Sequence, residues 1–185
     1  MVTDIRGYHA NDLVVCRGLW HELTEHHQEI YDDSSIGGET PGHLFDEHLA
    51  NVGVDRVWVA EKKGKIVGMV SLQDSEGGLE IEPIIVKKGH RGEGIGEKLL
   101  RFAIQKAREL GVRYLMIRPV MRNWDAIRKF HREGFVNIGR IELFKDLRGM
   151  NGKKDHLCLE FNSGIDAVSP VVWRPNFRKG SLPVI

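Results

Sequence analysis

The first part of the chain carries a helical pattern of apolar positions. Between Asn11 and Tyr31, the residues of one buried stripe recur every three or four positions, as on an amphipathic helix. They are Leu13, Cys16, Trp20, Leu23, His27 and Ile30. A short strand is predicted before this helix, over 2–6. A polar, glycine-rich loop follows over 32–42, and a second, shorter helix is predicted over 43–51.

The pattern then changes to short strands. Apolar stretches over 57–60, 66–72 and 79–86 are separated by short turns, so these strands are expected to pair antiparallel. A glycine-rich segment over 87–96 leads into a helix that ends at Gly111, where glycine commonly terminates helices. The apolar face of that helix is formed by Ile95, Leu99, Phe102, Ala103, Ala107 and Leu110.

The remaining elements complete a mixed sheet. A strand is expected over 114–117, then a helix capped by Asn123 that closes at Gly134, and then strands over 135–144 and 157–161. This order predicts an α+β fold with a central mixed, mostly antiparallel sheet flanked by helices.

The chain is expected to divide into one domain over 1–162 and a C-terminal extension over 163–185. The extension has no clear period, but it carries Trp173 and Phe177. These large apolar side chains predict that the extension packs on the domain or on a partner subunit. A homodimer is the assembly expected, since twofold contacts are the commonest among soluble proteins.

Composition narrows the class of protein. Hydrophobic residues make up 41% of the chain and charged residues 29%, which is enough for a packed core. A net charge of +1 gives no basic excess for a nucleic-acid partner. Cys16 and Cys158 are too few for a disulfide framework. No apolar run is long enough to span a membrane and no signal region is visible, so a cytoplasmic location is expected.

The segment from Val86 to Gly96 carries the most specific chemistry. A strand ends, glycines follow and a helix begins, so backbone N–H groups at the helix start are free to bind phosphate. A P-loop would need Lys and Ser or Thr after the last glycine, but Glu97 and Lys98 stand there. The glycine spacing and the antiparallel strands also differ from a dinucleotide-binding fingerprint.

Two motifs resemble the Gcn5-related N-acetyltransferase (GNAT) family. Arg91 to Gly96 reads Arg-x-x-Gly-x-Gly, which is similar to the CoA-binding signature of that family. A second family motif is matched at Asn123, Ala126, Phe130, Gly134 and Phe135. The family has a tyrosine after the helix phenylalanine, whereas this chain has His131. The resemblance spans about 55–162 and implies the GNAT acyl-CoA N-acyltransferase fold.

The resemblance also implies an activity. An enzyme of this type moves acetyl from acetyl-CoA to a primary amine by direct attack in a ternary complex. The residues implied to bind acetyl-CoA are Ile84, Ile85, Val86, Arg91, Gly92, Glu93, Gly94, Ile95, Gly96, Asn123 and Phe130. The alternatives are a protein N-terminal or lysine acetyltransferase and a non-catalytic CoA-binding module.

The first helices and their loop would lie on the acceptor side in such a fold, and they are acidic. Glu25, Glu29, Asp32, Asp33 and Asp46 would suit a small cationic amine, although a solvated helix face explains them equally well.

Glu82 is the expected general base, because Glu-x-x-x-Val before the loop resembles small-amine acetyltransferases of the family. Period-two alternation would place Glu82 on one face with Ile84 and Val86, and Glu80 on that face is the rival. Pro83 fits either the splayed strands of the GNAT fold or a simple bulge.

His131 is expected to take the role that the family tyrosine plays, which is to protonate the departing thiolate. It could instead hold a water or cap its helix. No metal is expected: His21 and His26 are one residue too far apart for a His-Glu-x-x-His site, and His27 is read as a core histidine.

Overall fold

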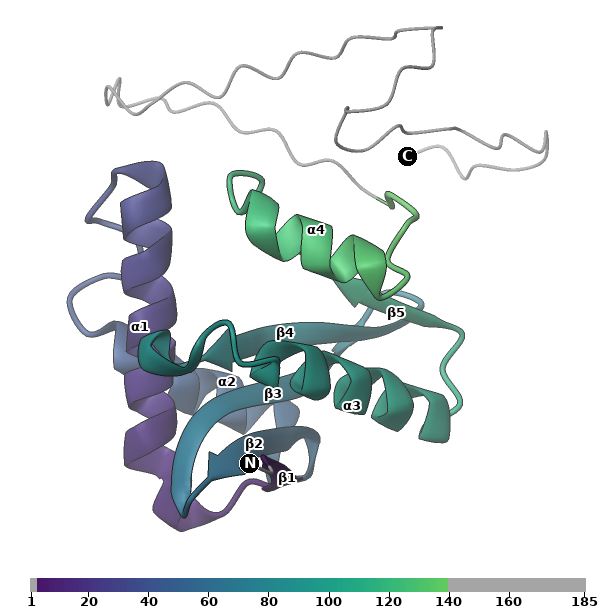
Figure 1. The fold of residues 1–185 in the computed structure, drawn as a ribbon, viewed down its shortest axis with the longest axis horizontal. Coiled ribbons are helices and arrows are strands. Elements are labelled where there is room, and N and C mark those ends of the chain that lie inside the picture. The colour runs from purple at the N-terminus through teal and green to yellow at the C-terminus, as the bar shows by residue number, and fades with distance from the viewer. Residues whose placement is uncertain (1–2, 140–185) are drawn as a thin grey trace, which may run out of the picture. The chain divides into compact units, whose positions relative to one another are not determined.

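The computed structural model describes residues 3–139, which form a sheet with helices on both faces (Figure 1). The strands are β1 (Asp4–Gly7), β2 (Val57–Lys62), β3 (Lys65–Ser75), β4 (Gly78–Val86) and β5 (Tyr114–Ile117). The helices are α1 (Leu13–Tyr31), α2 (Leu44–Val52), α3 (Ile95–Glu109) and α4 (Trp124–Arg132). Short 3₁₀ turns are η1 (Ala10–Asp12), η2 (Pro41–His43), η3 (Val54–Arg56) and η4 (Lys88–His90).

The predicted order of elements is confirmed through α4, and so is the α+β class. Residues 135–139 are not in a strand. The rest of the strand expected over 135–144, the one over 157–161 and the extension over 163–185 lie outside the described residues.

The described strands follow their sequence order across the sheet, β1-β2-β3-β4-β5. Short turns connect β2, β3 and β4, so these strands pair antiparallel, as expected. The connection from β4 to β5 passes through α3, and β4 and β5 pair parallel. The sheet is therefore mixed and mostly antiparallel.

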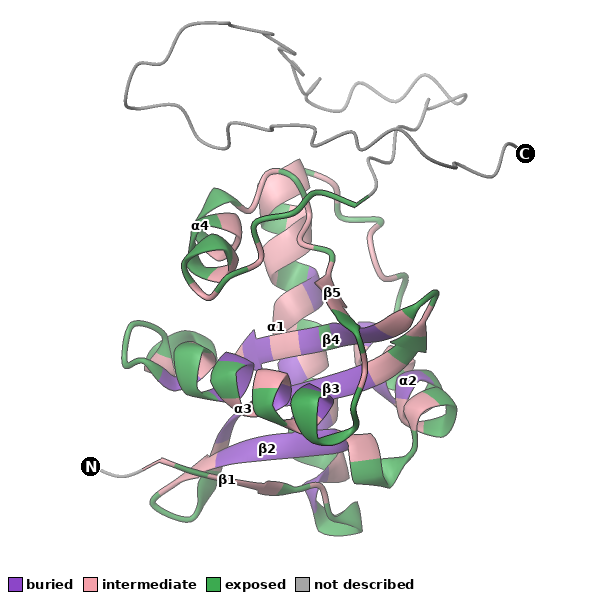
Figure 2. Ribbon diagram, turned by 90° about the vertical axis from the view of Figure 1, so that its right-hand side faces the viewer, coloured by how far each residue is buried: buried purple, intermediate pink, exposed green. Residues whose placement is uncertain are grey.

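Alternating strand residues contribute to two cores, one on each face of the sheet. Figure 2 shows that much of β2, β3 and β4 is buried. Val70 and Leu72 of β3 pack with Leu99 and Ala103 of α3 in one cluster. Met69, the β3 residue directly before Val70, belongs to the other cluster, which lies against α1 and α2. The second cluster contains Cys16, Leu19, Phe45, Val57, Val59, Met69 and Ile85. The core thus fixes α3 on one face of β4 and the two N-terminal helices on the opposite face.

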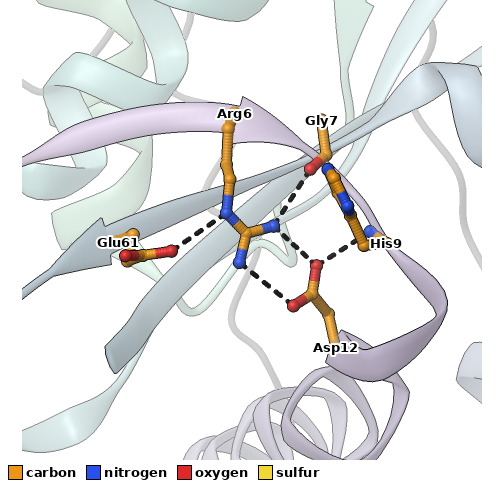
Figure 3. Close-up of polar contacts among 5 residues, drawn as sticks. All are labelled: Arg6, Gly7, His9, Asp12 and Glu61. Carbon is orange, nitrogen blue, oxygen red and sulfur yellow. Dashed lines mark hydrogen bonds and ion pairs between the residues drawn. The ribbon is translucent and has the colours of Figure 1, made fainter. Parts of the chain in front are cut away.

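An ion-pair cluster ties the start of α1 to the sheet (Figure 3). Arg6 of β1 donates to Asp12 at 2.7 and 3.1 Å, and its Nε donates to Glu61 of β2 at 2.9 Å. The backbone N–H of His9 also donates to Asp12, at 2.8 Å. Asp12 is buried, and the hydrogen bond from Arg6 holds its pKa below the usual value. The cluster fixes the turn at which α1 begins.

Candidate active site

One edge of β4 is open over its second half. β5 pairs with β4 only from Gly78↔Tyr114 to Ile81↔Ile117. Beyond Ile81 no described strand lies along that edge, while the opposite edge stays paired to β3 up to Gly68↔Val86. Backbone N–H and C=O groups near 84–86 that point toward the open edge are therefore available to an extended ligand.

A β-bulge lies where the edge opens. The β3–β4 register runs from Leu72↔Ile81 to Val70↔Ile84, so Glu82 and Pro83 stand opposite the single residue Ser71. Pro83 therefore lies both in a bulge and at the point where β5 leaves β4. The two interpretations of this proline do not exclude each other.

The bulge changes the face on which Glu82 lies. Ile81, Ile84 and Val86 all contact the α3-side cluster, whereas Ile85 belongs to the cluster under α1 and α2. The extra residue interrupts the alternation, so Glu82 faces the α1 and α2 side. The prediction that Glu82 shares a face with Ile84 and Val86 is wrong; its shared face with Glu80 is correct.

Gln73 of β3 links two carboxylates on that face. Its side-chain amide donates to Glu82 Oε2 at 2.7 Å and to Glu80 Oε2 at 3.3 Å. Glu82 is exposed, yet the protein around its carboxylate desolvates it and raises its pKa, and the negative charge of Glu80 adds to the rise. The hydrogen bond from Gln73 and the charge of Arg118 act in the opposite direction.

Glu80 is held differently from its neighbour. Its side chain is only 1% exposed and forms an ion pair with Arg118. Its second oxygen, Oε1, is buried and has no hydrogen-bond partner among residues 3–139. A buried carboxylate engaged with a guanidinium is poorly placed to receive a proton from a substrate, which favours Glu82 over its rival.

The glycine loop after β4 forms an open cradle. Gly92 and Gly94 have φ of 83° and 78°, in the left-handed region that favours glycine. A Cβ at either position would meet nothing within 4 Å, so the space above the backbone is open. α3 begins at Ile95 without a side-chain cap, which leaves its first N–H groups free for an anion.

Arg91 and Glu93 flank the cradle. Arg91 Nε donates to the Val86 carbonyl at 3.1 Å, and the exposed guanidinium makes no other hydrogen bond within the described part of the chain. Glu93 is paired with Lys62 of β2 and lies 3.1 Å from His90 Nδ1. These contacts fix the loop and leave the positive end of Arg91 exposed.

α1 contacts the same loop (Figure 1). The Lys88 backbone N–H donates to Glu22 at 2.9 Å, and the Lys88 ammonium lies 3.9 Å from Glu29. A small hollow lies between helix and loop, lined by Glu22, Glu25, His26, Glu29, Lys88 and Arg91. Among the acidic residues expected on the acceptor side, Asp46 pairs with Arg17 at 2.5 Å. Glu29 and Asp46 are thus paired with cations of the chain itself.

α4 carries the second motif. The Asn123 side chain accepts from the Ala126 N–H at 3.2 Å, which confirms the predicted cap. Phe130 is half-buried against the α3-side core and lies edge-on to Phe135, with ring centroids 6.4 Å apart. His131 is exposed, and its ring makes no hydrogen bond with residues 3–139.

Sequence reasoning missed the groups that surround Glu82. These are Gln73, Arg118, and Ser71, whose hydroxyl donates to the Glu82 carbonyl oxygen. One signal was available: Ser71 and Gln73 are polar residues two apart in an otherwise apolar strand, so both point to one face of β3. Arg118, after the end of β5, offered no comparable pattern.

Comparison with known proteins decides the family. A model of the acetyltransferase (GNAT) family matches residues 20–135, which is more than half of the chain. The chain belongs to the GNAT family. The match includes the opened strand, the glycine loop and α4. In that part of the chain which the structure describes, no cluster of His, Cys, Asp or Glu could hold a metal ion.

Two curated relatives are acetyltransferases by name. Streptothricin acetyltransferase of Streptomyces lavendulae is 44% identical over 61 residues, which cover 33% of this GNAT chain and 32% of the relative. N-acetyltransferase family 8 member 2 of Rattus norvegicus is 29% identical over 126 residues, or 64% of this chain and 51% of the relative. The chain spans about a third to a half of the length of the curated relatives it matches.

A solved structure shares the fold. The structure of yncA from Salmonella typhimurium with its cofactor acetyl-CoA has a TM-score of 0.57 and 23% identity, and the match covers 72% of this GNAT chain and 79% of that one. None of the helices described here is both long enough and apolar enough to cross a membrane.

Proposed function

We propose that this GNAT protein transfers acetyl from acetyl-CoA to a primary amine by direct attack in a ternary complex. The observation that carries the proposal is the opened edge of β4 running directly into an uncapped helix start. An extended pantetheine arm suits the first feature, and a pyrophosphate suits the second. The family match and the acetyl-CoA of the yncA structure support the same cosubstrate.

The cosubstrate would lie along a single segment of the chain. Ile84, Ile85 and Val86 offer main-chain groups to the pantetheine, and the loop from Arg91 to Gly96 offers N–H groups to the pyrophosphate. Arg91 adds a forked cation beside these amides. Asn123 and Phe130 would bound the site through α4, Asn123 by fixing its first turn and Phe130 by packing beneath it.

Glu82 is proposed as the general base. An ammonium acceptor must lose a proton before its nitrogen can attack the thioester carbonyl carbon, and Glu82 would take that proton directly or through water. The carbon–sulfur bond then breaks and the amide forms. Desolvation of its carboxylate by the surrounding protein and the charge of Glu80 raise the pKa of Glu82, which makes it a stronger base than an ordinary carboxylate.

His131 is proposed to return a proton to the departing thiolate, in the place of the family tyrosine. Its ring is exposed and free of hydrogen bonds within the described residues, so it can turn toward a bound thioester. A histidine ring carries an N–H that can donate to the thiolate sulfur, as the hydroxyl of a tyrosine would.

A small cationic amine is the proposed acceptor. Glu82 and Glu80 bring two carboxylates to the site, against the single positive charge of Arg118. One curated relative is named for the acetylation of streptothricin, which also supports this proposal. A protein N-terminus or lysine is the competing acceptor, and a CoA-binding module without turnover is the competing class.

Thiol release from acetyl-CoA against a panel of amines tests this function, with products identified by mass spectrometry. The panel should contain polyamines, aminoglycosides, amino acids, and peptides with a free N-terminus or lysine. We expect amine-dependent release with a small cationic amine, and lower kcat in Glu82→Gln and His131→Phe. Peptide acetylation alone would shift the acceptor class, and binding of CoA without turnover by any amine would contradict the enzyme proposal.

A further inference from the structure

A chain of buried polar groups leads from α2 to the bulge in β4. His48 of α2 is 8% exposed and Ser71 of β3 is 1% exposed. His48 Nε2 lies 2.7 Å from Ser71 Oγ, and the Ser71 hydroxyl hydrogen-bonds the main-chain carbonyl oxygen of Glu82. This series of hydrogen bonds therefore ends at Glu82, the residue proposed as the base.

The direction of each hydrogen bond follows from the chemistry of the three groups. A carbonyl oxygen can only accept, so Ser71 must donate its single proton to Glu82. Ser71 Oγ must then accept from His48, which places the imidazole proton on Nε2. Burial lowers the pKa of His48 to about 4, so the ring stays neutral near neutral pH and keeps this arrangement.

Helix packing holds His48, the first residue in this series of hydrogen bonds. The His48 ring lies against Trp20 of α1, with ring centroids 5.1 Å apart, and Trp20 also contacts Phe45 of α2 at 6.1 Å. Phe45 is fully buried. The imidazole is thus held between α1 and α2 as well as by its hydrogen bond to Ser71.

At its other end, the series reaches Glu82 at the β-bulge, where the regular pairing of β3 and β4 is interrupted. A bulge leaves an extra residue without an ordinary ladder partner, which would free the Glu82 main chain to change orientation. The Ser71 hydroxyl supplies a donor at this point. Gln73, two residues along the same strand, holds the Glu82 carboxylate at 2.7 Å. β3 therefore holds both ends of Glu82, its main chain and its carboxylate.

We infer that His48 and Ser71 are positioning residues that fix Glu82 at the bulge and so set where its carboxylate meets the amine acceptor. The inference rests on the proposed role of Glu82. Both residues are buried, so neither is placed to touch the substrates. Their loss should lower kcat and leave the KM for acetyl-CoA unchanged, because the glycine loop that holds the pyrophosphate makes no contact with them.

The test compares full-length variants for kcat, KM for acetyl-CoA, the pH dependence of kcat/KM and melting temperature, with one amine acceptor throughout. Ser71→Ala and His48→Leu remove the hydroxyl and the N–H donor. We expect kcat to fall on the order of tenfold, since small displacements of a reacting group have effects of this size or larger. The acid limb of the profile should shift from its wild-type position, because a displaced Glu82 carboxylate changes both its desolvation and its hydrogen bond from Gln73.

Conservative replacements separate the hydrogen bonds from general packing. Ser71→Thr keeps a hydroxyl, and His48→Gln places an amide N–H near the position of Nε2, so both should recover part of the lost kcat. His48→Asn is polar but too short to reach Ser71 and should behave like His48→Leu. Val52→Ala is the matched control: Val52 packs on the same core from the last turn of α2 but belongs neither to the hydrogen bonds nor to the ring contacts that hold His48, so this variant should lower the melting temperature and retain the wild-type kcat and acid limb.

The outcomes distinguish the inference from the function on which it rests. If Glu82→Gln is impaired while Ser71→Ala and His48→Leu keep wild-type kcat and acid limb, the inference is overturned and the base assignment stands. Wild-type turnover in Glu82→Gln would overturn both. A fall in kcat that Val52→Ala reproduces at equal loss of melting temperature would show general destabilisation and would also overturn the inference. If the alanine and leucine variants do not fold, recovery by His48→Gln but not by His48→Asn decides it.

Discussion

Glu82 lies between neighbours that shift its pKa in opposite directions. Desolvation by the surrounding protein and the charge of Glu80 raise that pKa, and the hydrogen bond from Gln73 lowers it. If Glu82 is the base, kcat/KM should decline as pH falls through its raised pKa. Glu80→Gln removes the like charge and should move this acid limb to lower pH. Gln73→Leu removes the hydrogen bond to the charged form and should move it to higher pH.

The same amine acceptor should be used with all three proteins, because its ionisation then affects each pH profile equally. The pH dependence of kcat/KM then isolates the change at the carboxylate. Acid limbs that coincide in wild type, Glu80→Gln and Gln73→Leu would show that another group controls this limb.

Asp12 provides a prediction on stability. Its pKa is lowered in the folded protein by Arg6, so its contribution to stability is present above the unfolded pKa of about 4 and is lost as pH falls through the folded value. Asp12→Asn should cost about 2 kcal/mol at pH 7, the scale of a partly buried charged hydrogen bond. Urea unfolding at pH 7 and at successively lower pH measures this difference, which should shrink below about pH 4.

The control is Asp46→Asn, which breaks a more exposed pair with Arg17, whose side chains are both 35% exposed. It should change stability less than Asp12→Asn. A larger effect from the Asp46 variant would contradict the importance given to the buried cluster.

At the scale of elements, the close approach of β5 to the start of β4 depends on a glycine. A Cβ at Gly78 would lie 2.1 Å from the Tyr114 carbonyl oxygen, closer than real Cβ atoms come. Gly78→Ala should therefore disrupt the parallel pairing and cost on the order of 2 kcal/mol in chemical unfolding. Gly18→Ala on α1 is the matched control: a Cβ there meets nothing within 4 Å, so it should stabilise slightly.

If the two alanine variants have the same stability, the tight β4–β5 contact does not constrain the fold. Loss of acetyl-CoA binding in Gly78→Ala would further indicate that the opened edge requires β5 in its observed place.

Periodicity predicted the described helices and strands because each buries an apolar face with a period of 3.6 or 2. It placed α1, α3 and the β2–β3–β4 hairpins nearly at their observed bounds. It failed at Glu82, because one extra residue in β4 reverses the alternation and no local pattern identifies a bulge with certainty. Gln73, Ser71 and His48 were missed for a related reason: their importance comes from strand pairing and helix packing between distant segments.

At the scale of the whole molecule, the extension over 163–185 stays a prediction from sequence. Val171, Val172, Trp173 and Phe177 place four large apolar side chains in a short segment. A chain truncated at Gly164 should melt at a lower temperature or sediment as a smaller species than the full chain. Identical melting and sedimentation would refute packing of the extension on either the domain or a second copy.

Acetyl-CoA binding is proposed to depend on one segment, the opened edge of β4 with the glycine loop that follows it. Calorimetric titration with acetyl-CoA tests this segment most directly, with wild type, Gly94→Val and Gly53→Val compared. Gly94 and Gly53 have φ of 78° and 79°, and a Cβ at either meets nothing within 4 Å. Gly53 has a ψ of 157°, against 3° at Gly94, which is the more strained backbone for a valine, so Gly53→Val controls for at least as much strain. Only Gly94→Val would place a side chain in the cradle. We predict that wild type and Gly53→Val bind acetyl-CoA and that Gly94→Val loses at least about tenfold in affinity, or about 1.4 kcal/mol. Equal binding by all three would contradict the account.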